Sequence, residues 1–260
     1  MSTVIVNYGG GTNSTAMLVE ALNRGEQVDA IVMADTGSER PGTLEYTRRF
    51  SAWLQARGYP KIIVTRWIRR DGTFLPLHEW CERFTSLPSR AFGLSGCTSK
   101  WKQQPVDKAV RALPCVVEAH GRGERVQRWI GYDADEPGRA ERMQARRAGD
   151  ELFVWRSPLV EWDMGRDECV DVIMAAGLPL PGKSACWLCP SMKRHEIDAL
   201  REDHPDLLAR ALAIEETADI DRSRIRGLGG SLNWKEYLQQ PRLFTGRRPV
   251  ESACGCFDGD

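Results

Sequence analysis

Apolar runs and amphipathic stretches alternate along the first part of the chain. Residues 3–8, 30–34 and 62–65 are short apolar runs, and residues 14–23 and 43–56 between them have the spacing of helices. Near-continuous apolar strands that alternate with helices are typical of a parallel sheet covered by helices. We therefore predict an α/β fold in which a twisted parallel sheet has helices on both faces.

The later elements follow a looser pattern. Two more strands are expected at 126–131 and 152–155, and helices at 105–112, 166–176 and 192–217, the last broken near Pro205. Residues 66–100 are irregular and rich in Arg, Gly, Ser and Pro, which predicts an insertion or lid. The expected organisation is an α/β domain over 1–180 and a helical C-terminal region with a tail over 181–260.

Composition narrows the class of protein. The 260 residues carry no net charge and are 42% hydrophobic, which is ordinary for a globular chain. No apolar run approaches the roughly 20 residues that span a bilayer, and no leader precedes the first strand, so a cytoplasmic protein without a membrane partner is expected. Eight cysteines in such a chain favour metal binding, redox chemistry or burial over a disulfide scaffold.

A glycine-rich turn joins the first strand to the first helix. It consists of Gly9, Gly10, Gly11, Thr12, Asn13 and Ser14. Glycines let backbone N–H groups approach a phosphate, and the helix N-terminus adds unpaired N–H groups and a positive dipole end. Asn13 and Ser14 could cap the helix or donate to phosphate oxygens. The Walker sequence fails for lack of a lysine, and the dinucleotide fingerprint fails at Ser14. A turn without a ligand is the weaker alternative.

The turn resembles the PP-loop, Ser-Gly-Gly-x-Asp/Asn-Ser, with Gly9 in place of the serine. Four more segments are similar, in order, to those of the adenine nucleotide α-hydrolase-like superfamily, close to its phosphoadenylylsulfate (PAPS) reductase branch. They are Asp35-Thr36-Gly37, the stretch from Gly96 to Lys102, the stretch from Gly131 to Arg139, and Ser157-Pro158-Leu159-Val160-Glu161-Trp162. The resemblance covers most of residues 3–200 and implies the fold of that superfamily.

Further site residues are implied by this resemblance. Nucleotide binding is expected of the glycine-rich turn together with Asp35, Thr36, Gly131 and Glu136. Asp35 could accept from ribose hydroxyls or help to hold Mg²⁺, and a turn-forming role is its alternative. Lys100 and Arg139 are candidates for binding phosphate or sulfate, and surface ion pairs are the alternative of equal weight.

Five of the eight cysteines lie in segments rich in Gly, Ser, Thr and Pro, where loops are expected. Cys186 and Cys189 form a Cys-x-x-Cys, which suits zinc, an iron–sulfur cluster or a redox dithiol. The resemblance favours a [4Fe–4S] cluster with Cys97 as a third ligand. Cys254 or Cys256 could be the fourth ligand or a nucleophilic tail thiol; otherwise one iron stays open for an extra sulfide.

The resemblance implies an ATP pyrophosphatase that transfers sulfur. ATP would adenylate an acceptor, expected to be nucleic acid as in tRNA thiolation or DNA phosphorothioation, and sulfur would then displace AMP. A PAPS or adenylylsulfate reductase that binds a sulfonucleotide and releases sulfite is the first alternative, and a nucleotide-binding module without turnover is the second. A cysteine desulfurase or another sulfur donor is the expected partner, and a homodimer is left open.

Overall fold

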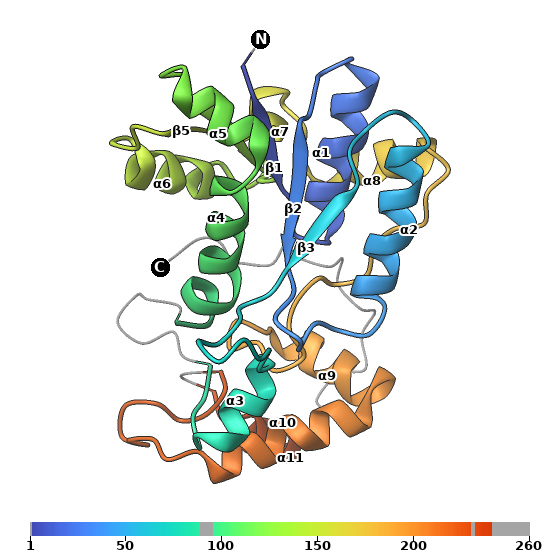
Figure 1. The fold of residues 1–260 in the computed structure, drawn as a ribbon. Coiled ribbons are helices and arrows are strands. Elements are labelled where there is room, and N and C mark those ends of the chain that lie inside the picture. Colours follow the sequence, from blue (N-terminus) through green and yellow to red (C-terminus); the bar gives the residue numbers. More distant parts are fainter. Residues whose placement is uncertain (1, 89–95, 230–231, 241–260) are drawn as a thin grey trace. The chain divides into compact units, whose positions relative to one another are not determined.

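The computed structural model describes residues 2–88, 96–229 and 232–240 (Figure 1). These residues form two compact units, each built from separated stretches of the chain. The first unit comprises Met1–Ala34, Pro41–Thr65 and Gln103–Ser184, and the second comprises Asp35–Arg40, Arg66–Lys102 and the chain from Ala185 onward. None of the helices in the described ranges has the length and hydrophobicity needed to cross a membrane.

The first unit contains a five-stranded sheet with the order β3-β2-β1-β4-β5, in which every neighbouring pair is parallel. The strands are β1 (Val4–Asn7), β2 (Ala30–Ala34), β3 (Ile62–Thr65), β4 (Val126–Ile130) and β5 (Phe153–Arg156). The helices of this unit are α1 (Thr12–Asn23), α2 (Thr43–Gln55), α4 (Gln104–Arg111), α5 (Pro114–Gly121), α6 (Pro137–Arg147), α7 (Pro158–Glu161) and α8 (Arg166–Ala175).

Alternate residues of β1 and β2 enter two different cores. Val4, Val6 and Met33 pack with residues of α1, α2 and α8. Ile5 and Val32 face the opposite way and pack with residues of α4 and α5. Figure 1 shows these two groups of helices on opposite sides of the sheet. The predicted α/β class, with a parallel sheet covered on both faces, is therefore confirmed.

The second unit is mainly helical, as predicted for the C-terminal region. It contains α3 (Leu77–Arg83), most of a π-helical segment η2 (Thr98–Gln103), α9 (Arg194–Asp203), α10 (Pro205–Thr217) and α11 (Trp234–Gln239). Its core joins Trp101, Trp187 and Trp234 to leucines and isoleucines of α9 and α10. The described part of residues 66–100, which were expected to be an irregular insertion, contributes α3 and the side chains of Trp67 and Trp80 to this core.

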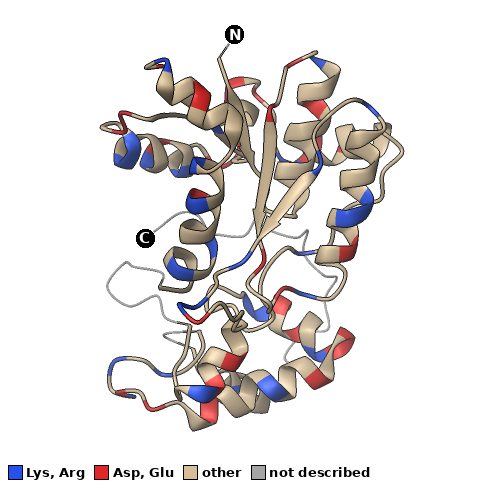
Figure 2. Ribbon diagram, viewed as in Figure 1, with Lys and Arg blue, Asp and Glu red and all other residues tan. Residues whose placement is uncertain are grey.

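Charges of both signs occur on the helices of each unit (Figure 2). Arg139 of α6 pairs with Glu136 at 2.5 Å. Arg147 lies over the ring of Trp155, 4.5 Å from its centroid. For these two arginines, contacts within the first unit therefore occupy at least part of the guanidinium group.

Candidate functional site

The glycine-rich turn leads into a helix whose N-terminus is buried and has no cap. Helix α1 begins at Thr12, and no side chain caps it at Gly11. Thr12, Asn13 and Ser14 are each less than 8% exposed. Within the described residues, no hydrogen bond reaches the backbone N–H groups of these three positions. Buried, unpaired N–H groups at a helix N-terminus are the arrangement that binds a phosphate.

The side chains of Asn13 and Ser14 are engaged elsewhere. Ser14 Oγ accepts from the N–H of Gly9 at 3.2 Å and donates to the carbonyl of Gly11 at 3.2 Å. Asn13 Nδ2 donates to Asp133 Oδ2 at 2.7 Å, and its Oδ1 accepts from Arg166 Nη1 at 2.7 Å. The expectation that these residues cap α1 is therefore wrong, because Gly11 occupies the capping position and both side chains form local contacts that shape the turn.

Gly131 brings the end of β4 against this turn. A Cβ atom at Gly131 would lie 2.9 Å from the backbone nitrogen of Ser14, so no larger residue fits without movement. Strand order reverses between β1 and β4, and ligands of open α/β sheets bind beyond the carboxyl ends of strands at such a point. The turn and the segment after Gly131 thus occupy the usual ligand position of this fold class.

Glu136 and Arg139, both predicted site residues, form an ion pair in this same segment. Their side chains meet at 2.5 Å, and the guanidinium of Arg139 lies 4.8 Å from the centroid of the Tyr132 ring. The alternative weighed for Arg139 was a surface ion pair, and the observed arginine is paired but buried, at 9% exposed. A role of either residue in nucleotide binding stays a prediction.

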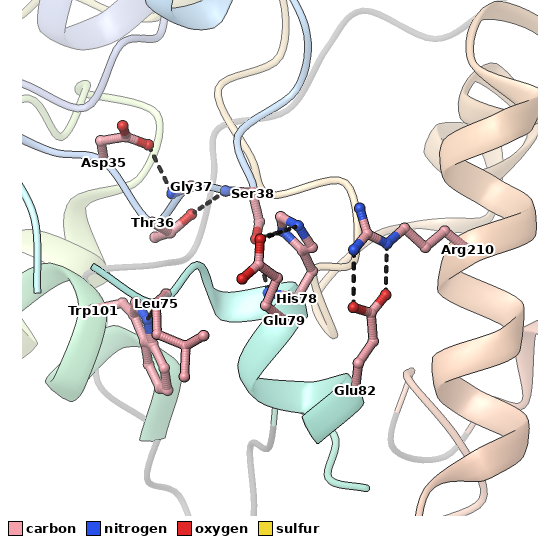
Figure 3. Close-up of polar contacts among 10 residues, drawn as sticks. All are labelled: Asp35, Thr36, Gly37, Ser38, Leu75, His78, Glu79, Glu82, Trp101 and Arg210. Atoms are coloured by element: carbon pink, nitrogen blue, oxygen red, sulfur yellow. Dashed lines mark hydrogen bonds and ion pairs between the residues drawn. The ribbon is translucent and has the colours of Figure 1, made fainter. Parts of the chain in front are cut away.

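Asp35 follows β2 directly and belongs to the second unit. Its Oδ1 accepts from the N–H of Gly37 at 2.8 Å (Figure 3). Its Oδ2 pairs with Arg66 at 2.7 Å. Asp35 is 1% exposed, and both of its oxygens have partners. The structure therefore shows the turn-forming role, and nucleotide binding by Asp35 stays a prediction.

The next residues connect this turn to α3. The N–H of Ser38 donates to Thr36 Oγ1 at 3.2 Å, and Ser38 Oγ lies 2.8 Å from His78 Nδ1 (Figure 3). Burial is the main cause that lowers the pKa of His78, and the nearby Arg210 adds to it. Arg210 itself is held by Glu82 through two hydrogen bonds of 2.6 and 2.9 Å.

Cys186 is fixed beside this same turn by backbone pairing. Glu39 and Cys186 form an antiparallel bridge, in which the N–H of Arg40 donates to Ala185 and the N–H of Trp187 donates to Ser38. The bridge places Cys186 Sγ 3.2 Å from Thr36 Oγ1 and 3.7 Å from Glu39 Oε1. One thiol of the Cys-x-x-Cys therefore lies among polar side chains in a buried setting.

Lys102 supplies a buried positive charge to the cysteines. It is 8% exposed; burial alone would lower its pKa, but the charges of Glu39, Cys186, Cys189 and Cys97 raise it above its usual value. Burial raises the pKa of Cys186 and of Cys189, whereas Lys102 lowers both. An ammonium group in this position favours sulfur that carries negative charge, as metal-bound thiolate does.

The chemistry of this donor set suits a soft metal, because buried thiols and a neutralising cation occur together. Cys97 and Cys189 are close enough to influence each other electrostatically. Within the described ranges, however, no group of three or more His, Cys, Asp or Glu side chains could hold a metal ion. Cys254 and Cys256 lie outside the described residues, so the cluster and its ligands stay a prediction.

Lys100 lies against three tryptophan rings. Its ammonium is 3.2 Å from the centroid of the Trp80 ring, 4.2 Å from that of Trp67 and 4.7 Å from that of Trp101. Burial and the charge of Arg69 lower its pKa. The sequence suggested a phosphate contact or an ion pair, and the cation–π contact is a third arrangement. Binding of phosphate or sulfate by Lys100 stays a prediction.

Four polar residues of these sites were missed from the sequence. Asp133 and Arg166 contact the turn from positions more than 100 residues away, and Glu39 and Lys102 lie near Cys186. Asp133 lies within a segment that the resemblance covers, and that position could have identified it as a candidate site residue. Nothing local marks Lys102 as buried, because the basic Lys100 and the polar Gln103 lie close to it in sequence.

Comparison with known proteins adds a likeness to solved structures. No protein-family model matches the chain, and no curated protein matches it. The solved structure of the U34-tRNA thiolase NcsA from Methanococcus maripaludis with its [4Fe-4S] cluster is 14% identical, with a TM-score of 0.41. The alignment covers 92% of this chain and 80% of that chain. Both values are too low to bear on function, which is inferred below from this chain's own residues.

Proposed function

We propose that this chain is a PP-loop enzyme that uses ATP to transfer sulfur to nucleic acid. The observation that carries the proposal is the buried, uncapped N-terminus of α1 after three glycines. Its unpaired N–H groups suit the phosphates of ATP, and they would stabilise negative charge that develops on those phosphates during reaction.

The proposed reaction has two steps. An oxygen of the acceptor attacks the α-phosphorus of ATP, a new P–O bond forms, and the bond to pyrophosphate breaks. Sulfide, supplied as such or released from a desulfurase persulfide by two thiols that become a disulfide, then attacks the activated atom, a bond to sulfur forms, and the original oxygen leaves with AMP. In this scheme the first unit binds ATP through residues 9–14, and the second unit supplies the cysteines.

A [4Fe–4S] cluster, if bound, would supply iron, a soft metal that binds sulfur. Cys97, Cys186 and Cys189 are the proposed ligands, and Lys102 would offset their negative charge. We expect anaerobic protein to contain iron and sulfide, and Cys186→Ser to lose most of both. Cys115→Ser is the matched control, because Cys115 lies on α5 in the first unit. Protein that is colourless and iron-free would refute this part of the proposal.

A sulfonucleotide reductase is the second candidate, but one position disfavours it. The reductase segment to which residues 131–139 are similar begins Gly-Ile-Arg, whereas this chain has Gly131-Tyr132-Asp133. The arginine that would attract a sulfate group is therefore replaced by Asp133, which is 2% exposed.

The products distinguish these functions. We would incubate the protein anaerobically with ATP, a labelled sulfur donor, and either tRNA or DNA, and measure pyrophosphate, AMP and label in the nucleic acid. Release of pyrophosphate with labelled nucleic acid is the expected result. Sulfite formed from a sulfonucleotide would indicate the reductase, and ATP binding without any product would indicate a binding module.

A further inference from the structure

The carboxylate of Asp133 is buried with only one of its two oxygens satisfied. Its Oδ2 accepts from Asn13, but within the described residues its Oδ1 has no hydrogen-bond partner. A buried carboxylate oxygen without a partner is costly, and such atoms are rare unless water, a ligand or an ion completes them. A group that binds next to Oδ1 would remove this cost.

The position of Asp133 points to the phosphate region of the proposed ATP site. It lies two residues after Gly131, whose backbone contacts Ser14 at the start of α1. It follows β4, which neighbours β1 at the point where strand order reverses. The unsatisfied oxygen therefore lies beside the turn that we assign to phosphate.

An unsatisfied donor lies on the other side of the same Asn13 side chain. Arg166 Nη1 donates to Asn13 Oδ1 at 2.7 Å, whereas Arg166 Nε is buried and has no partner in the described part of the chain. The Asn13 side chain thus lies between two unpaired groups of opposite charge, the carboxylate oxygen Oδ1 of Asp133 and the guanidinium Nε of Arg166. A metal-bound polyphosphate would satisfy both, because its cation could lie at the carboxylate oxygen and its anionic oxygens at the guanidinium.

The other carboxylates of the segment are already used. Asp135 Oδ2 accepts from the N–H of Arg166 at 2.7 Å, and Glu136 pairs with Arg139 at 2.5 Å. Burial, followed by the charge of Glu136, raises the pKa of Asp133. A divalent cation beside Asp133 would favour its ionised form and offset both effects.

We propose that Asp133 is a protein ligand of the Mg²⁺ that accompanies ATP at residues 9–14. The inference rests on the proposed ATP-binding function and adds a metal ligand to it. Mg²⁺ is held in such sites by one or two carboxylates, with phosphate oxygens and water completing the octahedron. A single carboxylate also agrees with the finding that, among the described residues, no group of three or more side chains could hold a metal by itself.

The test compares ATP affinity in Mg²⁺ with ATP affinity in EDTA by calorimetry. The wild-type protein should bind ATP at least about tenfold more tightly with Mg²⁺. Asp133→Asn should reduce this ratio to about threefold or less, because an amide keeps the contact with Asn13 but is a poor Mg²⁺ ligand. Asp135→Asn is the matched control, since it makes the same change of charge two residues away and should keep the wild-type ratio.

A second measurement does not depend on the folding of a variant. Fe²⁺ in place of Mg²⁺, with ATP, ascorbate and peroxide, should cleave the wild-type backbone near residues 131–135. The assignment of Asp133 would be overturned if cleavage occurred only elsewhere in the chain. It would also be overturned if Asp133→Asn kept the wild-type ratio of ATP affinities in Mg²⁺ and EDTA. Equal affinity of the wild type in Mg²⁺ and EDTA would overturn the metal site and leave ATP binding intact. Failure to bind ATP in either condition would overturn the proposed function, and the metal site with it.

Discussion

Thr36 Oγ1 lies 3.2 Å from Cys186 Sγ, although 150 positions separate the two residues in sequence. The Thr36 hydroxyl also donates to Glu39 Oε1 at 2.9 Å. The Thr36 hydroxyl can therefore accept a hydrogen bond from the Cys186 thiol while that thiol is neutral. Once the sulfur carries negative charge, the hydroxyl can turn and donate a hydrogen bond to it. Such a hydroxyl would stabilise a metal-bound thiolate from outside the ligand set.

Replacing Thr36 with valine should weaken metal retention, because valine has the same shape but no hydroxyl. Groups that hydrogen-bond metal ligands typically change affinity about 10- to 100-fold when removed. We expect Thr36→Val to lose iron to a chelator about tenfold faster than the wild type under anaerobic conditions. Thr217→Val is the control, because among the described residues the Thr217 hydroxyl donates only to carbonyls of α10. Equal rates for the two variants would contradict the assigned role.

Gly11→Val should abolish ATP binding with little effect on folding. A Cβ atom at Gly11 would lie 2.6 Å from Ser184 Oγ, which is the movable end of a side chain, so the fold can adjust. The valine methyl groups would occupy the space next to the N–H groups assigned to phosphate. Calorimetry with ATP should show at least about a hundredfold weaker binding, or ~2.7 kcal/mol.

Gly149→Val is the matched control, because Gly149 is exposed and nothing lies within 4 Å of its Cβ position. Thermal denaturation of both variants should give melting temperatures within a few degrees of the wild type. Unchanged ATP affinity in Gly11→Val would remove the phosphate assignment of this turn.

The strands were predictable from sequence, but several helices and much of the site were not. Strands β1 and β2 are short, mostly apolar runs buried along their whole length, which is a strong local signal, whereas Ile62 and Phe153 are the only buried residues of β3 and β5. Helix α6 was missed because Ala140 and Met143 are its only buried apolar residues among many arginines. Helix α5 was also missed, since only Val116 and Ala119 of its eight residues are buried.

The site shows the same division between local and distant signals. The glycine-rich turn was found because all its residues are consecutive and its glycines are diagnostic. Asp133 and Arg166 could not be placed beside it from sequence, because they meet Asn13 across 120 and 153 positions. The environment of Lys100 depends on tryptophans at three separate positions, so a sequence that shows only a basic residue suggests an ion pair or a phosphate.

Loss of the tail thiols should separate the two candidate enzymes. In a thiolation enzyme, changing Cys254 and Cys256 together to serine should preserve iron content and most ATP-dependent pyrophosphate release. In a reductase that uses a tail thiol as its nucleophile, turnover should disappear while iron remains. Both quantities would be measured on the same preparations. Loss of iron from the double variant would instead assign a tail cysteine as the fourth ligand, and our expectation would be wrong.

The pKa of His78 predicts a loss of stability on acidification. Its folded pKa lies below the usual 6.5, so the unfolded chain takes up a proton in a pH range where the folded chain does not. Stability therefore falls as the pH decreases through about 6.5, by up to about 1.4 kcal/mol per pH unit until the folded pKa is reached. For a chain of this size, each kcal/mol of lost stability lowers the melting temperature by roughly 2–4 °C.

His78→Gln should reduce the difference in melting temperature between pH 7.5 and pH 5.5, since glutamine does not titrate. His120→Gln, on α5 in the first unit, controls for loss of a histidine elsewhere. If His78→Gln and the wild type lose stability in parallel between these pH values, the difference arises from other groups.

The division of the second unit into separated stretches has a consequence for synthesis on the ribosome. Trp67, Trp80 and Trp101 belong to a core whose other side, around Trp187 and Leu188, is translated later. About 80 residues separate the two stretches, which at about 5–20 residues per second takes roughly 4 to 16 seconds. During that interval a tryptophan-rich segment of the nascent chain awaits its packing partners, which makes it a natural binding site for the chaperones that meet emerging polypeptides.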